Sequence, residues 1–219
     1  MARMARVVLP GIPHHVTQRG NRRQKVFFCD DDFREYLEYL SVGCGLSGTT
    51  CWAYCLMPNH VHLVLIPESE SGLRTTLAEA HRSYTRMINF RHNWRGHLWQ
   101  ERFHSFPMDE PHLLSAVRYV ELNPVRAGLV KSADEWLWSS ARAHLHKEPD
   151  LLLDRSPLLD SIADWSAYLK GCSSEESLEQ LRRHTRTGRP LGDDDFIDNA
   201  ELLTGRDLRP RRPGRRKEN

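Results

Sequence analysis

The stretch that decides the fold is Met-Pro-Asn-His-Val-His-Leu-Val-Leu at residues 57–65, where two histidines open a strongly apolar run. The run is short, rich in β-formers and follows a Pro-Asn turn signal, so it predicts a β-strand. Because side chains alternate along a strand, His60 and His62 share one face. Val61 and Leu63 lie on the other. Two imidazoles side by side on a strand are candidate metal ligands; the alternative is a polar pair at a sheet edge.

Outward from this strand, hydrophobic periodicity and turn residues predict an alternating series of elements. Strands are expected at 14–19, 50–57, 60–66 and 99–106, and helices at 30 to about 43, 72–90 and 110–122. The first helix is expected to be closed by Gly43, Gly45 and Gly48. The third helix is expected to be capped by Asp109 and to end at Asn123-Pro124. The order βαββαβα favours an α+β fold, an antiparallel sheet with helices packed on one face.

The C-terminal third has a weaker pattern. Glu148-Pro149 is a linker signal, residues 187–192 form a break, and short helices are expected near 157–170, 174–185 and 194–203. Residues from 209 onwards are rich in Pro and Arg and are expected to be disordered when alone. The sequence thus predicts a domain over 1–147, a helical extension over 148–205 and a basic tail over 206–219.

Composition is that of a globular protein, with 27% charged and 39% hydrophobic residues. No apolar run approaches the length of a membrane span, and the N-terminus lacks the apolar core of a secretory signal, so we expect a cytoplasmic protein.

The net charge of +2 is unevenly distributed along the chain. Residues 1–25 carry six basic groups and no acid, and residues 206–219 carry seven against two acids. Basic ends on an acidic body favour a polyanion partner such as nucleic acid, although solvated tails would show the same pattern.

The five cysteines are Cys29, Cys44, Cys51, Cys55 and Cys172, an odd number with no CxxC spacing. Buried free thiols in a reducing compartment are the expectation.

A second group of polar residues falls on the helix expected at 110–122. Tyr119 and Asn123 are four residues apart, so they lie on one face a turn from each other. A tyrosine supplies a phenolic nucleophile and an asparagine a neutral oxygen ligand, which suits a metal-bound phosphate. An amphipathic aromatic at the edge of the core is the simpler alternative for Tyr119.

Together these motifs resemble the single-tyrosine HUH transposases, and among them the REP-associated tyrosine transposases. The residues that carry the resemblance are His-Val-His after Met-Pro-Asn, Tyr-Val-Glu-Leu-Asn-Pro-Val-Arg at 119–126, Thr-Gln-Arg-Gly-Asn at 17–21, Trp-Gln-Glu-Arg-Phe at 99–103 and Trp-Ser-Ser at 138–140. The resemblance covers about residues 9 to 145; the Gly-Arg-Pro-Leu-Gly at 188–192 and the tail are a weaker match.

The resemblance implies a ferredoxin-like catalytic domain that cuts and rejoins single-stranded DNA beside palindromic hairpins. By position, His60 and His62 would be metal ligands, Asn123 the third ligand and Tyr119 the nucleophile that forms a 5′-phosphotyrosine. Two imidazoles and an amide oxygen leave sites open for phosphate and water, compatible with Mg²⁺ or Mn²⁺, although Zn²⁺ also suits histidine. Because imidazole ligands must be neutral, activity is expected to fall as the pH drops through about 6.5.

The expected partner is single-stranded DNA with hairpins, with no membrane and no obligatory protein partner, in a nucleoid-associated monomer or homodimer. Candidate DNA-binding residues are Arg19, Arg22, Arg23, Lys25, Arg82, Arg86, Arg102 and Arg126. Trp94 and Trp99 could stack on unpaired bases, but a core role is the more natural expectation.

Two other functions fit the same residues. One is a regulator derived from a transposase that binds hairpin DNA without cutting it, which the intact set of His60, His62, Tyr119 and Asn123 argues against. The other is a zinc hydrolase, which would lack an obvious acidic base near the histidines and leave Tyr119 without a role.

Overall fold

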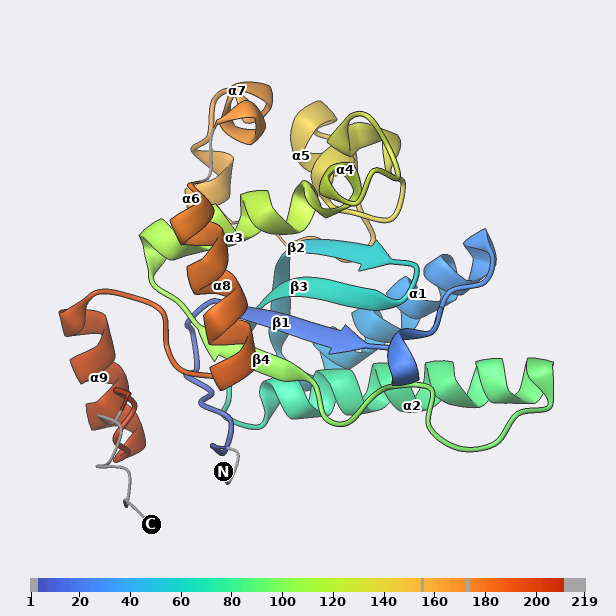
Figure 1. The fold of residues 1–219 in the computed structure, drawn as a ribbon, viewed down its shortest axis with the longest axis horizontal. Helices are drawn as coiled ribbons and strands as arrows, with labels where there is room; N and C mark the ends of the chain where they lie inside the picture. Colours follow the sequence, from blue (N-terminus) through green and yellow to red (C-terminus); the bar gives the residue numbers. More distant parts are fainter. Residues whose placement is uncertain (1–3, 155, 172–173, 211–219) are drawn as a thin grey trace, which may run out of the picture.

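The fold is seen in a computed structural model that describes residues 4–154, 156–171 and 174–210. Within these residues lies a four-stranded sheet with the order β2-β3-β1-β4, every neighbouring pair antiparallel (Figure 1). The strands are β1 (His14–Arg19), β2 (Thr49–Met57), β3 (His60–Pro67) and β4 (His104–Pro107). With α1 (Asp30–Ser47), α2 (Gly72–His92) and α3 (Glu110–Glu121), they give the expected order βαββαβα. The predicted α+β, ferredoxin-like fold is confirmed.

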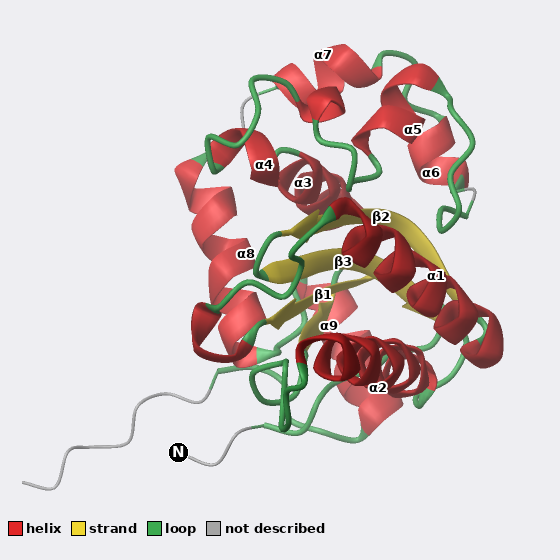
Figure 2. Cartoon of the chain, turned by 90° about the vertical axis from the view of Figure 1, so that its right-hand side faces the viewer, coloured by secondary structure: helices red, strands yellow, loops and turns green. Residues whose placement is uncertain are grey.

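One detail of that prediction is wrong, because the helices cover both faces of the sheet (Figure 2). Helices α1 and α2 pack on the face that carries Val61 and Leu63. Helix α3 packs on the opposite face, against Val64 of β3 and Cys55 of β2. Since β3 is apolar on both faces, each face has to be covered.

The first helix is longer than expected. Gly43 lies inside α1, and a Cβ there would come within 2.5 Å of the Thr76 carbonyl oxygen, so the glycine allows α1 to approach α2 closely. The helix ends instead at Gly48, which caps it in the left-handed conformation with φ 60°.

The last strand is shorter than the predicted 99–106. Residues before His104 make only an isolated bridge between Trp99 and Gly20. Glu101 has φ 45°, a left-handed conformation that breaks an extended strand. The chain here forms a loop that the Gln18 side chain holds through the carbonyl oxygens of residues 100 and 101.

The C-terminal part consists of short helices. They are α4 (Asn123–Arg126), α5 (Ala141–His146), α6 (Pro157–Asp160), α7 (Trp165–Lys170), α8 (Glu175–Thr187) and α9 (Asp194–Thr204), with 3-10 turns at Asn21–Arg23 and Ala133–Glu135. Those near 157–170, 174–185 and 194–203 were predicted, whereas the helices Asn123–Arg126 and Ala141–His146 were not. Helix α8 lies on the α3 side of the sheet, as shown by its Leu181, which packs in the same apolar cluster as Val117 of α3. Among the described residues, no helix is both long and apolar enough to cross a membrane.

The predicted disordered tail is partly ordered. Leu208 is 1% exposed, and Arg209 forms ion pairs with Asp198 (2.5 Å) and Glu201 (3.1 Å) of α9. Acidic residues on one helix therefore hold the first basic residues of the tail in place. The remainder of the predicted tail, 211–219, lies outside the described residues.

Of the cysteines, Cys44, Cys51 and Cys55 are buried free thiols, as predicted. Cys29 is exposed, contrary to expectation, because it occupies the N-cap position of α1 at the surface. Cys172 lies outside the described residues.

His14 makes the stability of this fold dependent on pH. It is fully buried, its Nε2 accepts from the Leu9 backbone N–H (3.1 Å), and its Nδ1 donates to the Ile12 carbonyl (2.7 Å). Burial lowers the pKa of His14 from 6.5 to about 4. The unfolded chain therefore binds a proton between these pH values that the folded chain does not.

We expect the free energy of unfolding to fall as the pH drops from about 6.5 to about 4, by up to about 3 kcal/mol from this residue. Urea unfolding at a series of pH values measures this slope. The His14→Gln variant should show a shallower slope, whereas replacement of the exposed His97 by Gln should leave it unchanged. Equal slopes for both variants would contradict the assignment.

Candidate active site

A cavity of about 630 Å³ opens where β1, β3, α3 and α8 meet. Its wall contains all four residues that the sequence predicted as the catalytic and metal-binding set, namely His60, His62, Tyr119 and Asn123. Further residues of the wall are Thr17, Gln18, Arg19, Arg23, Gln100, Glu101, His104, Arg182, Thr185 and Arg186. Residues from distant parts of the chain thus share one hollow.

The two histidines lie at the start of β3, opposite Arg19 and Thr17 of β1. Their ring centroids are 4.9 Å apart and the rings are nearly perpendicular. Because they are two residues apart on a strand, their rings face the same side, as the sequence predicted.

Hydrogen bonds fix how each imidazole is oriented. Nδ1 of His60 lies 2.6 Å from the Asn59 side-chain oxygen and so must donate, which leaves Nε2 with a free lone pair. Nδ1 of His62 lies 3.1 Å from Nε2 of the buried His15, whose ring stacks on it. When His62 donates to His15, its Nε2 is also free to bind a cation. Metal-binding histidines are held in this way by partners of their other nitrogen.

Burial keeps both imidazoles neutral. It lowers the pKa of His60 to about 4, with Arg19 adding to the effect. The pKa of His62 is well below 6.5, chiefly through burial and also through the neighbouring His60. Protonation of these rings is therefore expected at a lower pH than the 6.5 that the sequence alone suggested.

Tyr119 stands on the last turn of α3, a helix capped by Asp109, whose side chain accepts from the His112 backbone N–H (3.1 Å). The Tyr119 ring lies 5.6 Å from the ring of His62, edge to face. Asn123 opens α4 and donates its Nδ2 to the Tyr119 carbonyl oxygen (3.3 Å), so its Oδ1 is left as an acceptor. The helix break before Pro124 is as predicted.

Two guanidinium groups flank the Tyr119 side chain. The Cζ of Arg126 lies 4.0 Å from the centre of the ring, and its Nη2 donates to the Tyr119 carbonyl oxygen (2.6 Å). Arg182 of α8 approaches from the cavity and interacts with the Tyr119 side chain, while an ion pair with Glu175 (2.9 Å) holds it. Arg126, predicted as a DNA contact, is thus placed against the tyrosine.

Sequence reasoning missed the contribution of α8 to this cavity. Arg182 and Arg186 are four residues apart on a helix that also carries Glu175 and Glu179, so they share one face. That spacing was visible in the sequence. The sequence did not show which surface this face of the helix contacts, because Arg182 follows Tyr119 by 63 residues.

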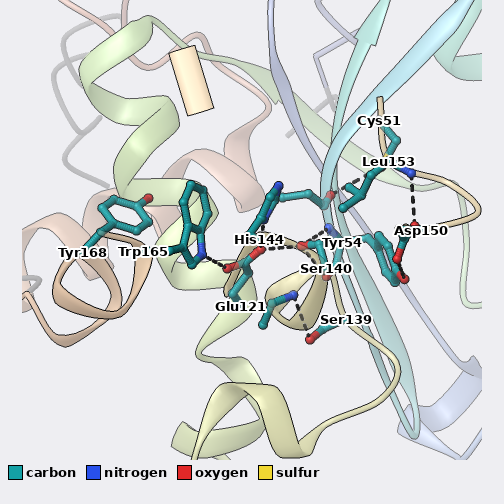
Figure 3. Close-up of polar contacts among 12 residues, drawn as sticks. Cys51, Tyr54, Glu121, Ser139, Ser140, His144, Asp150, Leu153, Trp165 and Tyr168 are labelled. Carbon is teal, nitrogen blue, oxygen red and sulfur yellow. Dashed lines mark hydrogen bonds and ion pairs between the residues drawn. The ribbon is translucent and has the colours of Figure 1, made fainter. Parts of the chain in front are cut away.

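The buried carboxylate of Glu121 was also missed (Figure 3). It is fully buried and accepts hydrogen bonds from Ser140 (2.5 Å), from Nδ1 of His144 (2.6 Å) and from the Trp165 indole (2.9 Å). These donors come from the segment around α5 and from α7. The network ties the end of α3, which carries Tyr119, to the C-terminal helices.

The other predicted DNA-binding residues fall in several places. Arg19 and Arg23 line the site cavity, and Arg82, Arg86 and Arg102 line a second cavity along α2. Lys25 lines a third cavity together with the half-exposed Trp94. Arg22 is exposed and lines none of these three cavities. Trp99 is buried in the core.

Comparison with known proteins gives consistent matches. The model of the family described as transposase IS200 like matches residues 10–123, just over half of the chain. A REP-associated tyrosine transposase of Escherichia coli K12 is 24% identical over 89 residues, which are 40% of this chain and 52% of that protein. A protein of Haemophilus influenzae, provisionally given the same description, is 28% identical over 99 residues, 40% of this chain and 56% of that protein. The match thus spans about half of each relative.

The fold matches that of a solved structure. It is that of a REP-associated tyrosine transposase bound to a REP hairpin, with a TM-score of 0.58 and 19% identity, covering 79% of this chain and 100% of the other.

We expect Glu121→Gln to destabilise the protein. An amide that replaces the carboxylate would face the Ser140, His144 and Trp165 donors with one acceptor oxygen in place of two, a loss of about 1–3 kcal/mol for a buried charged network. Urea unfolding checks this. The exposed Glu148→Gln serves as the matched control and should change little; equal effects of the two would show that the network contributes nothing.

Proposed function

Because the chain belongs to the transposase IS200-like family, we propose that it nicks single-stranded DNA beside hairpins and transfers the cut strand. The observation that carries the proposal is the Tyr119 ring facing the paired histidines in one cavity, 5.6 Å from His62. A nucleophile beside a candidate phosphate-binding centre is what such a reaction needs. One chain supplies all of these groups, which supports a reaction that needs no protein partner.

In the proposed reaction, the phenol oxygen of Tyr119 bonds to the scissile phosphorus and the bond from phosphorus to the 3′ oxygen breaks. The phenol proton passes to solvent, and the departing 3′ oxygen takes up a proton. The product is a 5′-phosphotyrosine and a free 3′-hydroxyl. Attack by another 3′-hydroxyl reverses the step and joins a new strand.

A divalent cation, Mg²⁺ or Mn²⁺, would be held by Nε2 of His60, Nε2 of His62 and the amide oxygen of Asn123. The fit rests on hydrogen bonds that leave Nε2 of His60 and the Asn123 oxygen unused, on the tautomer in which His62 donates to His15, and on burial that keeps the imidazoles neutral. When bound, such a cation acts as a Lewis acid that neutralises and orients the phosphate.

Arginine side chains of the chain itself supply further positive charge at the proposed site. Arg126 lies over the tyrosine ring and Arg182 faces its side chain, so a phenolate formed there would meet positive charge on two sides. Arg19 and Arg23, in the same wall, are placed to contact phosphates of the bound strand.

The proposal predicts a covalent protein–DNA adduct when the protein is incubated with hairpin-bearing single-stranded DNA and Mg²⁺ or Mn²⁺. A denaturing gel detects the adduct. It should be lost in Tyr119→Phe and in the double variant His60→Ala/His62→Ala, and retained in Tyr39→Phe, which changes a tyrosine outside the cavity.

Three other results would decide against it. Hairpin binding without an adduct would favour a non-catalytic regulator derived from a transposase. Cleavage that survives Tyr119→Phe would favour a zinc hydrolase. An undiminished adduct in Tyr119→Phe would exclude this tyrosine as the nucleophile.

Arg182→Ala should slow adduct formation at least tenfold, because a group that faces developing negative charge contributes most in the transition state. Single-turnover rates of adduct formation measure the effect. The neighbouring Arg183 lines a different hollow, so Arg183→Ala should leave the rate unchanged. Equal rates for the two variants would mean that Arg182 is not part of the reaction centre.

A further inference from the structure

Cleavage of the bond between phosphorus and the 3′ oxygen requires a proton for the departing oxygen. Without one, this oxygen leaves as an alkoxide, which is a poor leaving group. A side chain that is positioned to donate the proton accelerates such a step by about 10²–10⁴-fold. We therefore searched the wall of the site cavity for a group that could reach the far side of the phosphate from Tyr119.

A row of three side chains crosses the sheet at the base of this cavity. Thr17 of β1 is paired with His62 of β3 on one side and with His104 of β4 on the other. Residues that are directly paired on neighbouring strands project to the same face of a sheet. His104 therefore faces the same side as His62, and both line the cavity together with Tyr119.

Tyr119 and His104 reach the cavity from opposite edges of the sheet. Helix α3, which carries Tyr119, contacts β2 and β3, whereas His104 belongs to β4 at the other edge (Figure 1). Neighbouring strands are about 4.8 Å apart, so the backbone at His104 is about 10 Å from that at His62. A phosphate bound beside His62 would have the tyrosine on one side and His104 on the other.

This placement suits a substitution at phosphorus, in which the attacking and the leaving oxygen lie roughly in line. When the phenol oxygen of Tyr119 attacks from the α3 side, the 3′ oxygen departs toward β4. Imidazole is the side chain that most readily transfers protons near neutral pH. The other histidines in the described part of the cavity wall, His60 and His62, are taken up by the proposed cation.

A carboxylate accompanies His104. Oε1 of Glu101 lies 3.5 Å from Nε2 of His104, and both residues line the cavity. Histidine–carboxylate pairs are a recurring acid–base unit, in which the carboxylate orients the ring and stabilises the imidazolium. Glu101 has φ 45°, and its carbonyl oxygen accepts from Nε2 of the buried Gln18 (3.2 Å). Non-glycine residues in this conformation are costly and cluster at functional sites.

We propose that His104, oriented by Glu101, donates the proton to the departing 3′ oxygen. As the bond to phosphorus breaks, its electron pair stays on the 3′ oxygen and takes a ring proton of the His104 imidazolium. The products are a 3′-hydroxyl and a neutral imidazole. In the joining step the neutral imidazole accepts the proton of the attacking 3′-hydroxyl, because the reverse reaction follows the same path. This inference rests on the proposed function.

The test replaces the bridging 3′ oxygen of the scissile phosphate by sulfur. A thiol has a pKa of about 8.5, far below that of an alcohol, so a thiolate departs without a proton donor. Single-turnover rates of adduct formation by the full chain are measured on both DNA substrates with Mn²⁺. The His104→Gln variant should be slower on the oxygen substrate by about a hundredfold or more. On the sulfur substrate it should match the parent protein.

Glu101→Gln tests the positioning residue. It should slow cleavage of the oxygen substrate less than His104→Gln does and leave cleavage of the sulfur substrate unchanged. Fluorescence anisotropy with the hairpin DNA and a thermal melt check that both variants bind and fold as the parent does.

The matched controls are His146→Gln and Asp134→Asn. Nε2 of His146 and Oδ2 of Asp134 are also 3.5 Å apart, but this pair lies outside the site cavity. Both controls should cleave the two substrates at the parental rates.

Equal losses of His104→Gln on the oxygen and the sulfur substrate would mean that His104 only shapes the cavity, and would overturn the proposal. An unchanged rate of this variant on the oxygen substrate would also overturn it. Joining of a purified adduct to a strand with a 3′-hydroxyl should be slowed by His104→Gln as well, and a parental joining rate would contradict the assignment. Failure of the parent to form an adduct with either substrate would count against the proposed function itself.

Discussion

Burial of β3 on both faces is the constraint on which the rest of the structure depends. Val61, Leu63 and Val64 are all fully buried, so the strand needs a helical layer on each side. Helices α1 and α2 form one layer and α3 the other (Figure 2). The histidines lie at the start of β3, where the apolar run begins, and α3 reaches them because it packs along that second face. A site made of strand and helix residues is a consequence of the two-layered cover.

The tyrosine end of α3 is held from several directions. Glu121 binds the C-terminal helices through three hydrogen bonds, Asn123 bonds the carbonyl of Tyr119, and Arg126 lies over its ring. A nucleophile has to be kept within a narrow range of positions to be effective. Burial of the Glu121 carboxylate is unfavourable in free energy unless it is fully hydrogen-bonded. The network therefore also restricts the C-terminal helices, which supply the donors, to one arrangement.

The C-terminal helices therefore do more than extend the domain. Helix α8 adds Arg182 and Arg186 to the wall of the site, and α9 holds the start of the basic tail through Arg209. The family match ends at residue 123, before these elements begin. Helix α8, which lies beyond the matched region, therefore adds to the positive charge that Arg126 supplies at Tyr119.

The sequence by itself determined the order of strands and helices, the shared face of His60 and His62, and the helical spacing of Tyr119 and Asn123, because these follow from local periodicity and capping. It also predicted the helix break before Pro124 and the buried thiols Cys44, Cys51 and Cys55, but it wrongly included Cys29 among the buried ones. Only the tertiary structure decided that α3 covers the second face, that Arg182 faces Tyr119, and that His104 lies in one row with His62 across the sheet. Those outcomes depend on packing between segments far apart in the chain, and no pattern within a segment specifies its distant partner.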